Sequence, residues 1–320
     1  MTAACHQGTG HPVARGRPVV VLGDVGLDVL VRPGGPVVHG SDTPSDVALY
    51  PGGAGGNTAA WLAAYQVPVA LLARTGDDPA GTAASAQLEA SGVRCVLAVD
   101  EALPTGMVVV IVDASGERTM LPDRGANAAL GVDDVDLDRA ASAALGVGMP
   151  HLHVSGYVLF DEGSREAGLA ALAGAARRGW TTSVDPQAAS LIRAVGAQTF
   201  LGWVRGVDLL LPNESEADAL GGPDVLLGLV PHVAVTYGVG GARWFTVDGH
   251  HHAPAAAVEA VDPTGAGDAF DAGLLASWVT HDDPVRALRS GVVAGGRAVA
   301  TLGGRPPRVP PPQAARLSRP

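Results

Sequence analysis

The chain has 320 residues and contains no lysine, so that all 21 of its cationic side chains are arginines. P-loop nucleotide-binding proteins require a Gly-Lys-Ser/Thr sequence, and protein kinases require a strand lysine that pairs with the nucleotide phosphates. Enzymes that form Schiff bases need a lysine amine. The absence of lysine therefore excludes all three classes, and any chemistry on phosphate groups has to rely on backbone amides, metal ions and arginine.

Cysteine is also scarce. Cys5 and Cys95 cannot form a disulfide framework or a site with four thiolate ligands, and Cys95 lies in an apolar run where a small core residue is expected. The formal net charge of −11 argues against a nucleic-acid surface. No run reaches the ~18 uninterrupted apolar residues of a membrane span, and no signal-like segment opens the chain. We expect a cytoplasmic protein with neither nucleic acid nor membrane as a partner.

Short apolar runs alternate with helical segments along most of the chain. This rhythm predicts an α/β fold in which helices cover both faces of a mostly parallel sheet. The expected strands span residues 19–23, 67–73, 93–99, 107–112, 118–121, 151–155, 181–184, 208–211 and 233–236. The expected helices span residues 58–65, 78–91, 164–178, 214–220, 270–278 and 285–301.

Composition divides the chain into three parts. Residues 1–17 are a polar tail that we expect to be disordered, residues 18–306 are expected to form a single domain, and residues 307–320 are a tail rich in proline and arginine. Within the domain, residues 30–50 and 93–121 interrupt the alternation with β-rich sequence. We expect these two segments to form a small β-sheet lid, and two surface hairpins remain the alternative.

The segment Asp262-Pro-Thr-Gly-Ala-Gly-Asp-Ala-Phe270 carries the strongest functional signal. It predicts a glycine-rich turn that opens a helix, although a Gly-x-Gly sequence alone is equally compatible with a flexible turn. Backbone N–H groups at a helix N-terminus point in one direction and bind anions, phosphate above all. Asp268 would lie beside such a phosphate, where its carboxylate could accept a proton from an attacking hydroxyl.

A second glycine-rich segment is Pro51-Gly-Gly-Ala-Gly-Gly-Asn-Thr-Ala59. Glycines let the backbone approach a ligand closely, and Asn57 can cap a helix or bind a hydroxyl. Asp24 and Asp28 follow the first strand, at the carboxyl end of a sheet where ligands bind, although such an aspartate is often only part of a turn. These residues are therefore candidates for binding a polar substrate.

Two later strands are also followed by polar motifs. Asn213-Glu-Ser-Glu216 has the pattern of a capping box, with Asn213 as the N-cap and Glu216 as its partner. Thr236-Tyr-Gly-Val-Gly-Gly241 is a glycine-rich loop whose spacing and position do not match a Rossmann dinucleotide turn. Arg124 either approaches a phosphate group or is solvated.

Residues 262–270 closely resemble the C-terminal signature of the ribokinase-like (PfkB) carbohydrate kinase family, and residues 52–59 resemble its N-terminal signature Gly-Gly-x-x-x-Asn-x-Ala. Both occur in the expected order and spacing, and the resemblance covers residues 18–305. It implies a ribokinase-like three-layer α/β/α sandwich with a mostly parallel central sheet and a small β-sheet lid. It also implies ATP-dependent phosphorylation of a sugar hydroxyl with Mg²⁺, and K⁺ in some members.

The resemblance implies a role for each matching residue. Asp268 corresponds to the catalytic base, and its own N–H completes an anion hole formed by the amides of Gly265, Ala266 and Gly267. The residues expected to contact the sugar are Asp28, Gly52, Gly53 and Asn57, with Asp24 as the alternative to Asp28. The residues expected to bind the nucleotide are Asn213, Thr236, Gly238 and Gly241. The expected cation ligands are Glu216, for Mg²⁺ through water, and Asp262 and Thr264, for a monovalent cation.

The substrate stays open between several classes. Ribose-type members usually carry a lysine where this chain has Ala54, so fructose and a 2-keto-3-deoxy sugar acid remain candidates beside ribose. A nucleoside kinase acting on adenosine, inosine, guanosine or pseudouridine would need a platform for the base, and the expected lid holds only Tyr50 and neither Trp nor Phe. A non-catalytic sugar-binding regulatory protein would have lost the base or the anion hole. Exposed lid edges also suggest a homodimer through the lid.

Overall fold

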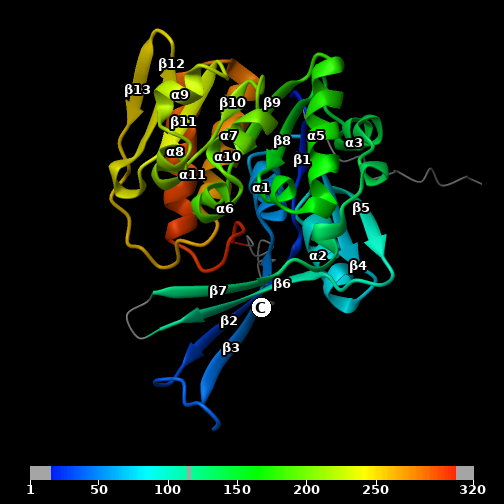
Figure 1. Ribbon diagram of the computed structural model, residues 1–320, viewed down its shortest axis with the longest axis vertical. Coiled ribbons are helices and arrows are strands. Elements are labelled where there is room, and N and C mark those ends of the chain that lie inside the picture. Colours follow the sequence, from blue (N-terminus) through cyan, green and yellow to red (C-terminus); the bar gives the residue numbers. More distant parts are fainter. Residues whose placement is uncertain (1–15, 114–116, 308–320) are drawn as a thin grey trace, which may run out of the picture.

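The larger of two β-sheets runs through the middle of the molecule (Figure 1). The computed structural model describes residues 16–113 and 117–307. Within them, this sheet has nine strands in the order β13-β12-β11-β10-β9-β8-β1-β4-β5. The strands are β1 (Val19–Leu22), β4 (Val69–Gly76), β5 (Arg94–Asp100), β8 (His151–Ser155), β9 (Thr181–Asp185), β10 (Leu209–Leu210), β11 (His232–Thr236), β12 (Ala242–Thr246) and β13 (Gly249–Ala253). In this order the strands from β11 through β10, β9, β8, β1 and β4 to β5 pair in parallel, and β12 and β13 are antiparallel additions beside β11.

Strand β1 lies at the centre of the sheet because its sequence, Val-Val-Val-Leu, is apolar on both faces. Val20 and Leu22 belong to one hydrophobic core, whereas Val19 and Val21 belong to the other. A strand with this alternation has to be covered on both sides, and helices cover both faces of the sheet in Figure 1.

Each core is closed by its own set of helices. The first core contains buried residues from α3 (Leu137–Ala144), α4 (Tyr157–Phe160), α5 (Glu162–Arg177), α6 (Ala189–Val195), α7 (Ala197–Trp203), α8 (Glu214–Ala219) and α9 (Pro223–Leu227). The second contains buried residues from α1 (Ala54–Ala64), α2 (Pro79–Ala90), α10 (Ala266–His281) and α11 (Pro284–Val299). Short 3₁₀ turns are η1 (Gly125–Ala129), η2 (Val132–Asp134) and η3 (Gly238–Gly240). The three-layer α/β/α arrangement expected from the sequence is confirmed.

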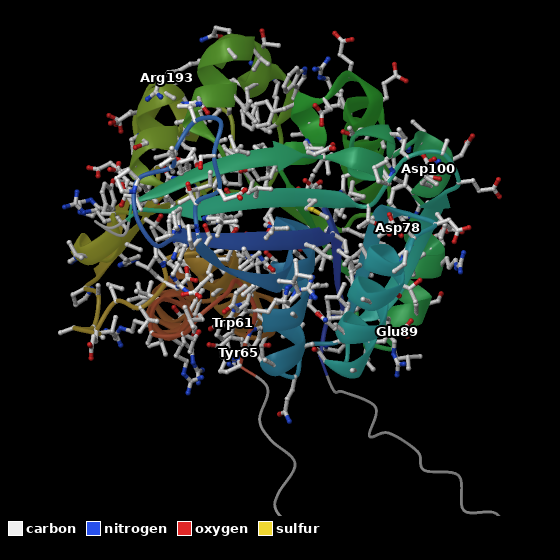
Figure 2. The ribbon with its side chains drawn as sticks, turned by 90° about the horizontal axis from the view of Figure 1, so that it is seen from below. Trp61, Tyr65, Asp78, Glu89, Asp100 and Arg193 are labelled. Carbon is white, nitrogen blue, oxygen red and sulfur yellow. The ribbon has the colours of Figure 1, made fainter. Side chains whose placement is uncertain are left out.

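The smaller sheet is the expected lid, with four strands in the order β3-β2-β6-β7. They are β2 (Gly26–Pro33), β3 (Ser45–Gly52), β6 (Gly106–Val112) and β7 (Arg118–Asp123). Strand β2 pairs antiparallel with β3 and parallel with β6, and β7 closes the sheet antiparallel to β6. The lid lies below the sandwich in Figure 1, and Figure 2 shows its strands running across the body.

The prediction that residues 93–121 belong to the lid was wrong for the first part of this segment. Residues 94–100 form β5, which pairs with β4 at the edge of the large sheet. The physical reason is burial on both faces, since Val93 belongs to one main core and Val96 to the other. Apolar periodicity indicates a strand but does not tell which sheet it joins.

Other boundaries also differ from expectation. The helices expected from residues 58 and 270 begin at Ala54 and Ala266, directly after the glycines at residues 53 and 265. Most of the expected tails, residues 1–15 and 308–320, lies outside the described residues. Arg17, the last residue of the expected N-terminal tail, is held by hydrogen bonds from its guanidinium to Met149 O and Thr181 Oγ1, each of 2.8 Å. In the part of the chain described, none of the helices is long and apolar enough to cross a membrane.

Candidate active site

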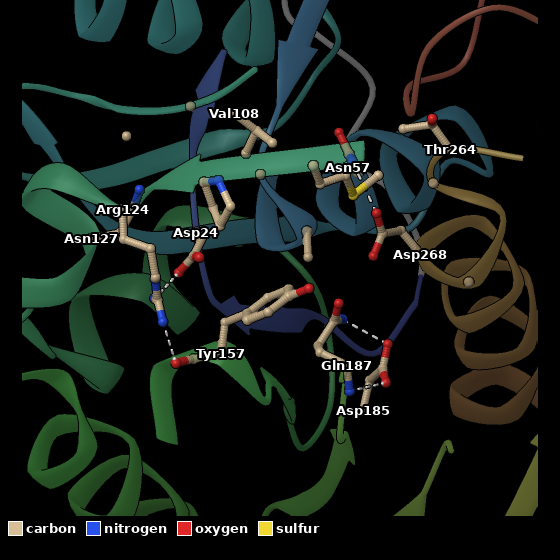
Figure 3. A pocket seen from close by; sticks show the side chains of 18 of the residues that line it. Asp24, Asn57, Val108, Arg124, Asn127, Tyr157, Asp185, Gln187, Thr264 and Asp268 are labelled. Atoms are coloured by element: carbon tan, nitrogen blue, oxygen red, sulfur yellow. Dashed lines mark hydrogen bonds and ion pairs between the residues drawn. The ribbon is translucent and has the colours of Figure 1, made fainter. Parts of the chain in front are cut away.

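A cavity of about 610 Å³ lies between the lid and the carboxyl ends of the parallel strands. Its walls come from the lid, from the ends of β1 and β9, from helix α4, and from the turn that begins α10. Ligands of open α/β sheets bind at this end of the strands. Figure 3 shows polar side chains from several of these elements around the cavity, among them Asn57, Asp185, Gln187 and Asp268.

Asp268 stands in the first turn of α10 and is only 7% exposed. Asn57 Nδ2, on α1, donates a hydrogen bond of 2.8 Å to Asp268 Oδ2. Burial raises the pKa of Asp268 to about 6, and the hydrogen bonds from Asn57 and Gln187 oppose that rise. A carboxylate with such a pKa is ionised at neutral pH yet basic enough to accept a proton.

The turn before α10 can be formed only with glycine at residue 265. Gly265 is the N-cap with a φ of 71°, and a Cβ there would lie 2.5 Å from Gly304 Cα. Ala266 and Gly267 begin the helix and line the cavity together with Gly265. The Ala266 N–H also donates to Pro263 O at 3.2 Å, which tightens the turn. The N-terminus of a 16-residue helix therefore faces the cavity beside Asp268, as an anion site requires.

Of the two aspartates after β1, Asp28 is the one suited to bind substrate. It lies on lid strand β2, lines the cavity, and has its pKa raised to about 6 by burial, against the opposing charge of Arg305. Gly52 leaves room for it, because a Cβ at Gly52 would collide with the Asp28 carboxylate. Gly53 lines the cavity beside them, while Gly52 is not one of the lining residues.

Asp24 is committed to an ion pair. Arg124 Nη2 lies 2.7 Å from Asp24 Oδ1, and Arg124 Nη1 lies 2.6 Å from both Asp161 Oδ2 and the carbonyl oxygen of Tyr157 (Figure 3). Arg124 is thus neither solvated nor free of partners, and in this structure its charge is used to hold the cavity wall together.

A group of buried carboxylates lies beyond Asp268. The capping box is confirmed, since the Asn213 N–H donates to Glu216 Oε2 at 2.9 Å and the Glu216 N–H to Asn213 Oδ1 at 3.0 Å. Asp185 ends β9, and Asp271 lies one turn beyond Asp268 on α10. Burial and then the neighbouring carboxylates raise the pKa of Asp185 and of Asp271 well above the ordinary value, and burial raises that of Glu216.

These carboxylates fit Mg²⁺. Among the described residues, Asp271 Oδ2 is buried without a hydrogen-bond partner, and no preformed cluster of three or more His, Cys, Asp or Glu ligands is present. Mg²⁺ prefers oxygen ligands and keeps several waters when it is bound with a nucleotide. Glu216 and Asp185 line the cavity and would hold such an ion mainly through water.

The residues expected at the nucleotide are only partly brought together. Asn213 and Thr236 line the cavity at the ends of β10 and β11. Gly238 and Gly241 lie in and after the turn η3 and are not among the lining residues.

Asp262 and Thr264, the expected ligands of a monovalent cation, are both contacted by an arginine from the lid. Arg118 Nη1, on β7, lies 2.6 Å from Asp262 Oδ1 and also contacts Thr264 Oγ1. No local pattern pairs Arg118 with this turn, because the two segments are more than a hundred residues apart in the chain.

Arg305 was also missed. It follows the turn at Gly303 and Gly304, which Trp61 Nε1 fixes by donating to Gly304 O at 3.0 Å. Arg305 Nη2 donates to Gly52 O at 3.0 Å, and Arg305 Nε approaches Asn57 Oδ1 at 3.4 Å. Burial lowers the pKa of Arg305 to about 10, against the attraction of Asp28, so it remains a cation between the lid and Asp268.

A family model described as pfkB family carbohydrate kinase matches residues 18–310. The chain belongs to this family. An ATP-dependent ribose-1-phosphate kinase from Halopiger xanaduensis is 32% identical over 262 residues, which cover 79% of this chain and 81% of that protein.

Solved structures share the fold of this pfkB-family chain. The adenosine kinase of Sinorhizobium meliloti has a TM-score of 0.80 at 24% identity, covering 91% of this chain and 96% of that one. A putative ribokinase II from E. coli has a TM-score of 0.79 at 24% identity, covering 90% of this chain and 94% of that one. The predicted ribokinase-like fold is confirmed, and the chain is a phosphotransferase of the carbohydrate kinase family rather than the non-catalytic binding protein considered above.

Proposed function

We propose that this kinase transfers the γ-phosphoryl group of ATP, bound with Mg²⁺, to a primary hydroxyl of a sugar, with Asp268 as the base. The observation that carries the proposal is the position of Asp268. Its buried carboxylate, oriented by Asn57, shares one cavity with the glycine-rich N-terminus of α10 and with Asp28 of the lid. A proton acceptor and an anion site side by side are the two parts that phosphoryl transfer to an alcohol needs.

The proposed transfer forms one bond, breaks one bond and moves one proton. The sugar hydroxyl oxygen forms a bond to the γ-phosphorus, the bond from that phosphorus to the β–γ bridging oxygen breaks, and ADP leaves. The hydroxyl proton passes to the Asp268 carboxylate. The amides of Gly265, Ala266, Gly267 and Asp268 stabilise the charge on the phosphoryl oxygens, which is the larger part of catalysis in such reactions. Glu216 and Asp185 would hold Mg²⁺ mainly through water, and the ion, when bound, would neutralise phosphate charge and favour departure of the leaving group.

The remaining expected contacts belong to this proposal. Asp28 and Asn57 bind sugar hydroxyls, Gly53 gives the sugar access to the backbone, and Gly52, expected to contact the sugar, acts by leaving room for the Asp28 carboxylate. Asn213 and Thr236 contact the phosphate end of the nucleotide, and the turn with Gly238 and Gly241 contacts the rest of it. Lid closure over the cavity excludes water and limits hydrolysis of ATP.

The sugar candidates are ribose, fructose, a 2-keto-3-deoxy sugar acid and, by similarity to the relative from Halopiger xanaduensis, ribose 1-phosphate. Coupled ADP-release assays with ATP and Mg²⁺ over this panel test the proposal. Turnover of one sugar, and none of its analogue that lacks the primary hydroxyl, supports it. Measurable ATP binding without turnover of any acceptor argues against it.

A nucleoside is the second candidate, favoured by one observation. Part of the cavity wall is apolar, with Tyr157 and Phe160 of α4 on the body and Val108 and Val110 of β6 on the lid. Figure 3 shows Tyr157 and Val108 on opposite sides of the cavity, so that a flat base could lie between them. The body thus supplies aromatic side chains to the cavity wall, whereas Tyr50 of lid strand β3 does not line the cavity. The same assay decides between the two classes when it includes adenosine, inosine, guanosine and pseudouridine. In addition, Tyr157→Ala should weaken turnover of a nucleoside more than that of a free sugar.

Association through the lid is a further proposal. Val47, Leu49, Met120 and Leu121, all on lid strands, are more than half exposed. Light scattering of the purified protein tests whether it is a dimer, and Leu49→Lys should return a lid dimer to monomers. A location in the cytoplasm and the absence of nucleic-acid partners likewise stay predictions.

A further inference from the structure

A lid arginine lies against the turn that begins the anion site. Arg118 is the first residue of β7, and its Nη1 is 2.6 Å from Asp262 Oδ1 and in contact with Thr264 Oγ1. The side chains of Arg118 and Asp262 are 13% and 3% exposed. Thr264 directly precedes Gly265, the N-cap of α10. The guanidinium is therefore an interior contact of the candidate site.

The buried carboxylate of Asp262 needs a positive charge beside it. A buried carboxylate without a partner is costly, and at Asp262 its charge would also repel the nucleotide phosphates beside it. The Thr264 and Gly303 N–H groups donate to the Asp262 carboxylate at 2.7 and 3.0 Å but carry no net charge. Arg118, 2.6 Å from Asp262 Oδ1, supplies the compensating positive charge.

The same contacts do not fit a bound monovalent cation. Such an ion needs the lone pairs of several oxygens, whereas the oxygens of Asp262 and Thr264 are occupied by N–H donors. Asp262 Oδ1 accepts from Arg118 and from the Thr264 N–H at 2.7 Å, and Asp262 Oδ2 accepts from the Gly303 N–H at 3.0 Å. Thr264 Oγ1 is contacted by the same Arg118 nitrogen.

We propose that Arg118 takes the place of a monovalent cation in this kinase, neutralising Asp262 and fixing the turn from Thr264 to Gly265, so that phosphoryl transfer is independent of K⁺. The inference rests on the proposed function of the anion site. Arg118 is a positioning residue, since it acts through the turn and not on the phosphate. Because it is carried by β7, the anion site is complete only when the lid lies against the body.

The test compares initial rates in potassium chloride and in choline chloride at equal ionic strength, with ATP as a potassium-free salt. The wild type should give equal rates in both. Arg118→Ala opens space beside Asp262, and in choline its kcat should be about tenfold to a hundredfold lower than that of the wild type. The upper figure is comparable to the loss caused by removing one hydrogen-bond donor from an oxyanion hole. Potassium should restore that rate along a saturation curve, while the KM for the sugar changes little.

Two further variants separate charge from folding. Arg118→Lys keeps the cation and should stay independent of potassium. Arg32→Ala removes an exposed arginine from lid strand β2 and should behave as the wild type. Thermal melting gives a readout that does not depend on turnover: potassium should raise the melting temperature of Arg118→Ala and leave that of the wild type unchanged. If Arg118→Ala does not fold, Arg118→Gln allows the same comparison.

Saturable activation of the wild type by potassium would overturn the inference, as would an Arg118→Ala variant that matches the wild type in both salts. These failures differ from failure of the proposed function. In that case the wild type would phosphorylate no acceptor in either salt, and the melting temperatures would still show whether Arg118 replaces the ion.

Discussion

Asn57 donates a hydrogen bond of 2.8 Å to the carboxylate of Asp268 across 211 positions of sequence. Asn57 belongs to the glycine-rich segment that begins α1, and Asp268 belongs to the one that begins α10. The two strongest motifs of the chain are therefore joined by a single contact. That contact orients the Asp268 carboxylate and opposes the rise of its pKa that burial causes.

The activity should fall in acid with a midpoint near pH 6. Asp268 has to be ionised to accept the hydroxyl proton, and burial raises its pKa to about 6. Protonation of Asp268 therefore removes activity as the pH falls through that value, and Asp28, with a pKa also near 6, steepens the loss. The acid limb of the pH profile of kcat/KM measures this loss of activity. An acid limb with its midpoint near pH 4 would contradict the prediction.

Asn57→Ala should move the acid limb to higher pH and lower kcat. The hydrogen bond from Asn57 favours the ionised form of Asp268, so its loss lets burial raise the pKa further. Asn127→Ala is the control, because the buried Asn127 side chain bonds the backbone of Val25 and should cost stability without moving the limb. An unchanged limb in Asn57→Ala would show that the contact does not tune the base.

Gly265→Ala should lower both stability and kcat. Alanine at a φ of 71° costs ~1–2 kcal/mol, and its Cβ would also lie 2.5 Å from Gly304 Cα and displace the anion site. Gly179→Ala is matched to it, with a φ of 69° and no atom within 4 Å of the added Cβ. Melting temperatures and steady-state rates should show a stability loss in both variants but a loss of kcat only in Gly265→Ala.

Asp271→Asn should stabilise the protein at neutral pH. The pKa of Asp271 is raised well above 3.8 by burial and by Asp185, so the native state binds a proton that the unfolded state releases. The stabilisation from such a group is complete below pH 3.8 and is lost as the pH rises through the folded-state pKa. Asparagine removes the titration and can still donate to Asp185. Between pH 5 and 8, the melting temperature of Asp271→Asn should be higher than that of the wild type and should change less with pH.

Asp138→Asn serves as the control for that experiment. Asp138 forms an ion pair with Arg178 at the surface, far from the cavity, and its loss should change the melting temperature little. A fall in the melting temperature of Asp271→Asn at neutral pH would mean that Asp271 contributes an ionised partner that the fold requires.

Much of the fold and the centre of the site follow from local sequence. A run such as Val19 to Leu22 needs cover on both faces, and a glycine-rich turn before a helix forms an anion site from its own backbone. These features were predicted because each depends on neighbouring residues. The capping box of Asn213 and Glu216 was predicted for the same reason.

The errors and omissions arise where the deciding contact is distant in sequence. Residues 94–100 have the pattern of a strand, and only pairing with β4 shows that they belong to the main sheet and not to the lid. Arg118 and Arg305 carry no local signal, because their partners lie on other elements. Asp185 could have been found, since it ends a parallel strand at the edge where ligands bind.

The most direct test of the account is the turnover of Asp268→Asn on the acceptor that the panel assay identifies. Asparagine keeps the size of the side chain but cannot accept the proton. We predict that kcat falls by about 10²–10⁴, the usual contribution of a general base, while binding of ATP and of the acceptor persists in calorimetry. Turnover within about tenfold of the wild type would contradict the assignment of Asp268 as the base and with it the proposed mechanism.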